Sequence, residues 1–300
     1  MDAAVVWLFL QQGVLSGLIT GSVYALLAIA IVSVFKTTDV PNFAQGEIFM
    51  TGGYVALRLL IVGGLPYAVV IPLTIAIVAC VAALFERTVM ERVTASKGIG
   101  VQLVIATLGF AYALKGLVRL TGLGDSPRSL PSLVPGDMVM IGDAALTQLD
   151  LVIGLVSVLV MLLIYAMFRW TRIGRAMRAV GMNPRAAQIV GIRLSRVRML
   201  VWGMSGLISG VAVLLIAPKV LITPDIAHIA ILAYAAAIVG GFTSLPGAVL
   251  GGLLIGVVEN LVGLFVSTNA IVVAPFLAML VTLVLRPQGL LGGAPQMKKV

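Results

Sequence analysis

Long runs without a charged residue dominate the hydrophobic pattern of this chain. Seven stretches, each at least seventeen residues long, contain no Asp, Glu, Lys or Arg: 3–35, 59–85, 98–114, 151–168, 199–218, 226–258 and 260–285. A helix needs roughly 20 mostly apolar residues to cross a hydrocarbon core about 30 Å thick. The pattern therefore predicts an all-α, polytopic membrane protein, with all 300 residues in a single transmembrane domain.

The number of membrane spans follows from where these runs are interrupted. A further segment, Phe43–Val62, fits between Lys36 and Gly63 if Glu47 and Arg58 lie near its ends. The run 226–258 is too long for one span, and it is broken by glycine and proline within 240–247. It forms either two full spans or two half-helices that meet at a re-entrant break. We expect eight or nine transmembrane helices.

Glycines spaced four residues apart predict where helices pack closely. Gly13, Gly17 and Gly21 form a triple in the first helix. The other pairs are Gly206 with Gly210, Gly247 with Gly251, and Gly252 with Gly256. Small residues at this spacing let two helix backbones approach each other where lipid gives no hydrophobic drive for association. With 33 glycines some pairs arise by chance, so the triple is the strongest signal.

Basic and acidic residues are segregated between loops, which predicts the orientation. The segment 170–198 and the residue before it hold eight arginines and no acid: Arg169, Arg172, Arg175, Arg178, Arg185, Arg193, Arg196 and Arg198. The segment 121–150 holds Asp125, Asp137, Asp143 and Asp150 against Arg128 alone. Because Lys and Arg are retained in the cytoplasm during insertion, we expect the first segment inside and the second outside.

The remaining charges extend this topology to both ends of the chain. Alternation of the spans puts Arg87, Arg92 and Lys97 inside and the start of the chain outside. The first apolar run is too long for a signal-peptide core and has Asp2 before it, so we interpret it as a retained helix. Arg286, Lys298 and Lys299 then lie inside.

Composition excludes a water-soluble protein. Hydrophobic residues make up 61% of the chain and charged residues only 10%, with a mean hydropathy of +1.16. So few charges could not cover the surface of a soluble protein of this length. The net charge of +9 does not indicate nucleic-acid binding, because one cluster supplies most of the excess and it is not interleaved with aromatic residues.

Several kinds of catalytic chemistry are absent from the sequence. No Gly is followed by Lys, so the chain has no phosphate-binding loop of the GxxxxGK[ST] type. His228 is the only histidine, which argues against a histidine-based catalytic triad and against zinc motifs that need several histidines. Cys80 is the only cysteine, so the chain has no pair of cysteines for a disulfide or a CxxC motif. We expect Cys80 to be a buried packing residue. Glu259 is the acid that we expect deepest in a span, with either a functional role or a solvated position near an interface.

The arginine-rich segment contains a short helix with clear boundaries. Asn183 and Pro184 read as an N-cap followed by proline at the first helical position, and Gly191 ends the helix. Ala186, Ala187 and Val190 share one face, with Arg185 and Gln188 around it. Such a helix suits a groove on a cytoplasmic partner. The alternative is a generic basic loop that lies on anionic lipid.

Four blocks follow one another along the chain: Gly21-Ser22-Val23-Tyr24-Ala25-Leu26 with Asn42-Phe43-Ala44-Gln45-Gly46-Glu47 and Gly52-Gly53-Tyr54; 171–192; Gly240-Gly241 through Ser244, Gly247, Gly251 and Gly252; and Arg286-Pro287-Gln288-Gly289-Leu290. Together and in this order they resemble the permease subunits of branched-chain (hydrophobic) amino-acid ABC importers. The chain departs from the family pattern at Gln45, where histidine is frequent, and beside Asn183-Pro184, where an acid is frequent.

The resemblance implies an ATP-driven importer in which this chain forms half of the translocation pathway. Its partners would be a second permease or a second copy of itself, two cytoplasmic ABC ATPase subunits and an extracytoplasmic solute-binding protein, in a bacterial inner membrane. The solute would be a branched-chain or related amino acid, an amide or urea. The chain itself would carry no catalytic residue, cofactor or metal.

The resemblance and the polar residues within apolar segments together give two sets of candidate site residues. Those that would couple the chain to the ATPases are Asn183, Pro184, Arg185, Ala186, Ala187, Val190 and Gly191. Those that would line the translocation pathway are Tyr24, Asn42, Gln45, Thr51, Tyr54, Glu259 and Asn260; interhelical hydrogen bonding is the alternative role for each of these.

Two other classes of protein remain as alternatives. An ion-coupled secondary transporter would need ion ligands at a broken helix, and the break within 240–247 could supply them with Glu259. An integral-membrane enzyme could use the external aspartates. However, their segment also contains Pro127, Pro131 and Pro135 and has the composition of a solvated surface loop.

Overall fold

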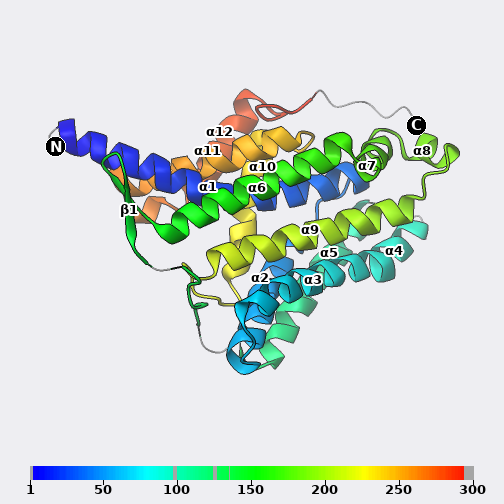
Figure 1. The fold of residues 1–300 in the computed structure, drawn as a ribbon. Helices are drawn as coiled ribbons and strands as arrows, with labels where there is room; N and C mark the ends of the chain where they lie inside the picture. Colours follow the sequence, from blue (N-terminus) through cyan, green and yellow to red (C-terminus); the bar gives the residue numbers. More distant parts are fainter. Residues whose placement is uncertain (1–2, 97–99, 124–126, 135, 294–300) are drawn as a thin grey trace. The chain divides into compact units, whose positions relative to one another are not determined.

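The computed structural model describes residues 3–96, 100–123, 127–134 and 136–293. Among the residues discussed above, Asp2, Lys97, Asp125, Pro135, Lys298 and Lys299 lie outside these ranges. The described residues form two compact units: those within 3–29, 131–161 and 231–293 in the first, and those within 30–130 and 162–230 in the second. Two long helices, α1 (Ala3–Thr38) and α6 (Gln148–Trp170), contribute residues to both (Figure 1).

The first unit is built on close packing between α1 and α11 (Leu245–Phe265). A Cβ atom added at Gly17 would lie 2.6 Å from the Val257 Cα atom, and one added at Gly252 would lie 2.4 Å from the Ala25 Cα atom. Gly13, Gly21 and Gly256 make similarly close approaches between the same two helices. The glycine triple thus marks a helix interface, as its spacing predicted.

A tight turn joins α11 to the shorter helix α10 (Ile229–Gly240). The turn contains Gly241, whose φ of +107° few other residues adopt, and the Ser244 side chain caps α11 by accepting from the Gly247 amide. The amides of Leu290 and Leu291 donate to the carbonyls of Val239 and Gly240. The predicted break is therefore confirmed, and the segment after α12 (Ala274–Leu285) packs on it.

The first unit also carries a β-hairpin. Strands β1 (Met138–Ile141) and β2 (Ala144–Thr147) pair antiparallel, with Met138 opposite Thr147. The Gln12 side chain of α1 donates to the Ala145 carbonyl and accepts from the Ala145 amide, so the hairpin is fixed to the helix. Asp150 belongs to the first turn of α6 and is 7% exposed, so the segment 121–150 is not solvated throughout.

The second unit is centred on α9 (Leu194–Ile216), which packs along α3 (Tyr67–Phe85) and α2 (Gln45–Leu57) (Figure 1). A Cβ atom added at Gly206 would lie 2.6 Å from the Val78 carbonyl oxygen. Gly210 lies close to Ile75, which is also on α3, so the pair of Gly206 and Gly210 marks the interface between α9 and α3. Helix α5 (Gly100–Leu120) packs against α2, and the largest side chain of the buried core is Trp202.

Two π-helical turns lengthen the helices of the second unit. Segment η1 (Arg58–Val62) follows α2 directly, so the predicted span Phe43–Val62 is a helix over residues 45–62. Segment η2 (Glu86–Met90) joins α3 to α4 (Glu91–Ala95), so this helix runs well past the last apolar residue of its charge-free run. Cys80 is exposed on α3, and the expectation of a buried packing residue was wrong.

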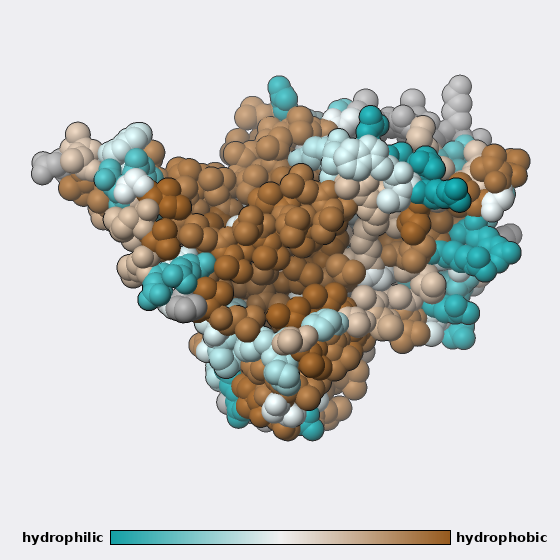
Figure 2. Space-filling model, in the orientation of Figure 1, coloured by the Kyte–Doolittle hydropathy of each residue, from teal (hydrophilic) through white to brown (hydrophobic). Residues whose placement is uncertain are grey.

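Six helices in the described residues are long and apolar enough to cross a membrane: Ala3–Thr38, Tyr67–Ala95, Gly100–Leu120, Gln148–Trp170, Leu194–Ile216 and Leu245–Phe265. Shorter apolar helices cover Ile226–Gly240 and Ala274–Leu285. Apolar side chains cover most of the visible surface of the long helices (Figure 2). The chain is an all-α polytopic membrane protein, and the predicted count of eight or nine is approximate.

Helix boundaries in the C-terminal part differ from the charge-free runs. The runs 226–258 and 260–285 are separated only by Glu259, but α11 continues through Glu259 and Asn260 to Phe265. The following chain forms η5 (Thr268–Ala270) before α12 begins. A single carboxylate can be carried inside a helix, so it does not mark the end of one.

Candidate functional site

The arginine-rich segment contains a helix before the predicted one. Helix α7 (Arg172–Met182) is capped by the Thr171 side chain, which accepts from the Gly174 amide. Gly174, Met177 and Val180 are buried, while Arg172, Arg175 and Arg178 are exposed. The helix is therefore amphipathic, with a face of arginines. Sequence reasoning missed it, although the spacing of its apolar residues is the signal that identifies it.

The predicted short helix is present as α8 (Pro184–Ile189). The Asn183 side-chain oxygen accepts from the Ala186 amide at 3.0 Å, and Pro184 occupies the first turn. Gly191 has a φ of +86°, and the Ile192 amide donates to the Ala187 carbonyl. These contacts confirm the predicted cap and glycine stop. Hydrophilic residues gather around α7 and α8 (Figure 2).

The exposed face of α8 differs from the one expected. Helix α8 packs against α7 and α9, and Ala187 is only 3% exposed. Ala186 is exposed, and the large apolar side chains that face outward are Ile189 and Val190, at 86% and 74%. Ala186, Ala187 and Val190 therefore do not form one accessible surface. A bulky residue at Ala187 would disturb packing within this chain rather than a partner contact.

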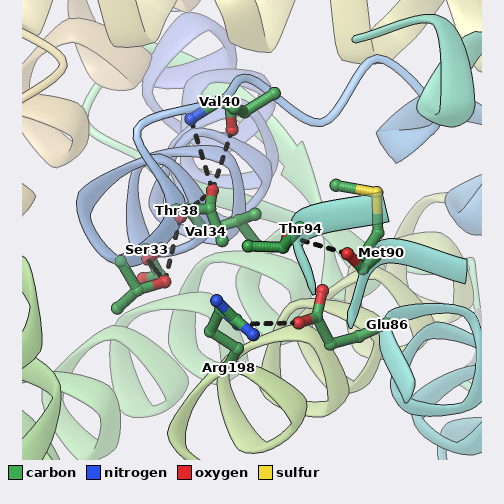
Figure 3. Close-up of polar contacts among 9 residues, drawn as sticks. Ser33, Val34, Thr38, Val40, Glu86, Met90, Thr94 and Arg198 are labelled. Carbon is green, nitrogen blue, oxygen red and sulfur yellow. Dashed lines mark hydrogen bonds and ion pairs between the residues drawn. The ribbon is translucent and has the colours of Figure 1, made fainter. Parts of the chain in front are cut away.

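A buried ion pair lies beside the start of α9. The Arg198 Nε atom is 3.0 Å from the Glu86 Oε1 atom, and the two side chains are 16% and 2% exposed. Figure 3 shows the pair bridging α9 and the π-helical turn η2. Glu86, and not Glu259, is thus the most buried glutamate of the described residues. It was missed because the charge-free run ends at residue 85.

We expect Glu86→Leu and Arg198→Met each to destabilise the protein strongly. Removing one partner of a buried ion pair leaves an uncompensated charge, which typically costs about 3–5 kcal/mol. Replacing both, as Glu86→Leu with Arg198→Met, should cost less than the two single changes together. Thermal unfolding of the purified single and double variants measures this, and strictly additive losses would contradict coupling between the two side chains.

Two of the predicted pathway residues form one buried hydrogen-bond network in the second unit. The Asn42 amide donates to Gln45 Oε1 at 3.0 Å, and the Gln45 amide donates to the Ser209 hydroxyl at 2.5 Å. The Ser205 hydroxyl also donates to Gln45 Oε1, at 2.8 Å. All four side chains are buried, so Gln45 fastens the start of α2 to α9. Ser205 and Ser209 were not among the expected residues, because a lone serine in an apolar run carries little signal.

Other predicted pathway residues meet in the first unit. The Tyr24 hydroxyl on α1 donates a hydrogen bond to the Glu259 carboxylate on α11. The Asn260 side chain donates to the Gly256 carbonyl of its own helix at 2.9 Å. Tyr24 and Glu259 therefore belong to one polar contact across a glycine-lined helix interface.

Thr51 and Tyr54 line a cavity of about 590 Å³ in the second unit. The walls come from α2, η1, α3 and α5 and include eight aliphatic side chains. Arg58 is the one charged residue of the lining. At the nearby end of α5, Lys115 donates to Asp225 at 3.0 Å, and this hydrogen bond lowers the pKa of the Asp225 carboxyl below its ordinary value.

The long apolar helices define a polytopic membrane protein with a capped, amphipathic, arginine-rich segment between two of its spans. Residues 13–285 match the family model described as branched-chain amino acid transport system / permease component. Because the match covers most of the chain, this protein belongs to that family.

Curated relatives match over nearly their whole length. The high-affinity branched-chain amino acid transport system permease protein LivH of Escherichia coli (strain K12) is 33% identical, over 97% of this chain and 98% of that protein. The corresponding protein BraD of Pseudomonas aeruginosa is 30% identical over the same shares. The solved structure of PsaBC from Streptococcus pneumoniae in complex with Fab covers 93% of this chain and 92% of its own, with 15% identity and a TM-score of 0.49.

Proposed function

We propose that this chain is the permease subunit of an ATP-driven importer for branched-chain or related amino acids. It forms half of a translocation pathway, opposite a homologous permease or a second copy of itself. Two ABC ATPase subunits and an extracytoplasmic solute-binding protein complete the assembly in a bacterial inner membrane. ATP is hydrolysed by the partner subunits, since GxxxxGK[ST] does not occur in this sequence.

The observation that carries this proposal is the capped helix α8 in its arginine-rich setting. Asn183 caps the start of the helix and Gly191 follows its end. The side chains of Ile189 and Val190 are exposed on the surface of the protein. Large apolar side chains that are exposed and surrounded by arginines are typical of a surface that binds another protein. We assign Asn183, Pro184, Arg185, Ala186, Ala187, Val190 and Gly191 to this coupling element, with Ala187 packing it on α7 and α9.

Movement of α8 has a direct route into the second unit. Only residues 190–193 separate α8 from α9, and Arg198 lies in the second turn of α9. Its ion pair with Glu86 links α9 to the helix formed by α3, η2 and α4. In alternating access, closure of the ATPases would displace α8, and this link would make α3 follow α9.

The proposed orientation follows the charges. Residues 170–198 and the C-terminus lie in the cytoplasm, while the N-terminus and residues 121–150 lie outside. The solute would pass the polar groups of Tyr24, Asn42, Gln45, Thr51, Tyr54, Glu259 and Asn260. Most of these are hydrogen-bonded within the protein, which supports a role in shaping the route as much as in binding solute.

Reconstituted transport tests the proposal. Proteoliposomes that contain the permease with its ATPases and binding protein should take up leucine only when ATP is enclosed with the ATPase domains. Urea and amides serve as competitor solutes, and their preferential uptake would change the solute class. Leucine uptake that follows an imposed proton or sodium gradient without ATP would contradict the proposal and favour an ion-coupled transporter.

A further inference from the structure

We propose that the cavity between α2, α3 and α5 binds one acyl chain of an anionic phospholipid, with its phosphate at Arg58. The cavity measures about 590 Å³, within the range of natural ligand pockets. It lies wholly in the second unit. The proposal assigns Thr51 and Tyr54, grouped above with the solute route, to the wall of this lipid site.

The cavity runs along the helices from their ends inward. Arg58 is the first residue of η1 and lies in the last five residues of the helix over 45–62, and Thr121 and Leu123 follow the last residue of α5, so these residues lie toward one end of the cavity. Ile77 and Val81 lie ten or more residues beyond the start of α3, which places them about 15 Å or more along that helix. A charged mouth with a deep apolar interior fits a lipid whose headgroup stays at the interface and whose chain enters the protein.

The walls match the chemistry of an acyl chain. Eight aliphatic side chains line the cavity, and the polar lining besides Arg58 consists of three hydroxyl groups, those of Thr51, Tyr54 and Thr121. The Thr51 hydroxyl already donates to the Glu47 carbonyl of its own helix. Leu117 is 60% exposed, so the α5 wall borders the surface that hydrocarbon would cover.

The charge at the mouth selects an anion. Among the described residues Arg58 has no acidic partner, whereas the nearby Lys115 is paired with Asp225. An arginine can hold a phosphate through two parallel hydrogen bonds. A zwitterionic amino acid suits the site less, because no lining residue is acidic and its ammonium group would lie unpaired against aliphatic side chains.

Lipid retention by the intact permease complex tests this proposal. The complex is purified from nanodiscs of phosphatidylcholine mixed with phosphatidylglycerol, and bound lipid is measured by native mass spectrometry. Arg58→Gln should retain about tenfold less phosphatidylglycerol than the parent, the loss expected for one charge-assisted contact. Leu117→Trp should fill the cavity and reduce the retention of either lipid.

Arg119→Gln provides the matched control. Arg119 is exposed at the end of α5 that borders the cavity, but its own side chain does not line the cavity. The retention of phosphatidylglycerol by this variant should stay near the parental amount. Equal losses for Arg58→Gln and Arg119→Gln, or equal retention of phosphatidylcholine and phosphatidylglycerol by the parent, would overturn the site. Displacement of the lipid by free leucine would also overturn it and return the cavity to the solute route.

Discussion

Replacing Ile189 with aspartate is expected to abolish ATP-driven uptake while leaving the permease folded. The Ile189 side chain is 86% exposed, so the new charge disturbs little within the chain. If α8 docks in a groove of an ATPase subunit, the same charge has to be desolvated against that partner. Central apolar residues of an interface typically cost at least about 2 kcal/mol when lost, or roughly 30-fold in affinity. Co-purification of the ATPases and ATP turnover in proteoliposomes measure the loss.

A matched substitution separates docking from a general effect on the basic segment. Ile173→Asp places the same charge on an exposed isoleucine of α7, outside α8. It should keep its ATPases and transport near the parental rate. If both variants insert, retain the ATPases and transport normally, α8 is not the coupling element and the segment acts only as a basic membrane-surface loop.

The second large effect is expected from Gly252→Ala. The added methyl group would lie 2.4 Å from both the nitrogen and the Cα atom of Ala25, and backbone atoms inside a helix cannot move aside individually. Helices α1 and α11 would have to separate along their glycine-lined interface. We expect a loss of stability at or above the upper end of the roughly 1–3 kcal/mol typical of overpacking. Thermal unfolding monitored by size-exclusion chromatography in detergent measures it.

Gly116→Ala is the control for this change, since it makes the same chemical substitution on α5. No atom lies within 4 Å of a Cβ atom added at Gly116. Its thermal midpoint should equal or slightly exceed that of the parent, because alanine has the higher helix propensity. A Gly252→Ala protein that unfolds at the parental temperature would show that the helices can separate without cost, against the packing seen here.

The features that sequence predicted well are those with a local physical cause. Glycines at four-residue spacing let a neighbouring helix approach closely, and Gly13, Gly17 and Gly21 lie in such a close interface, with α11 as the neighbour. Asn183, Pro184 and Gly191 each define a helix end through their own backbone chemistry, and α8 has those ends. Such features need no knowledge of the tertiary fold.

The features that sequence missed depend on residues far apart in the chain. Glu86 appeared to end a span, and only its contact with Arg198 shows why a carboxylate is tolerated inside the helix. Ser205 and Ser209 became recognisable through Gln45, which lies on another helix. Burial of Ala187 depends on how α8 packs against α7 and α9, which its helical periodicity does not determine.

The packing of residues 286–293 on the turn after α10 has a consequence for biosynthesis. The Gly293 amide donates to the Thr243 hydroxyl across a separation of 50 residues, and Leu290 and Leu291 bond to the end of α10. During translation the turn leaves the ribosome well before the segment that covers it. The hairpin of α10 and α11 therefore forms in the membrane before the carbonyls of Val239 and Gly240 receive their hydrogen bonds from this later segment.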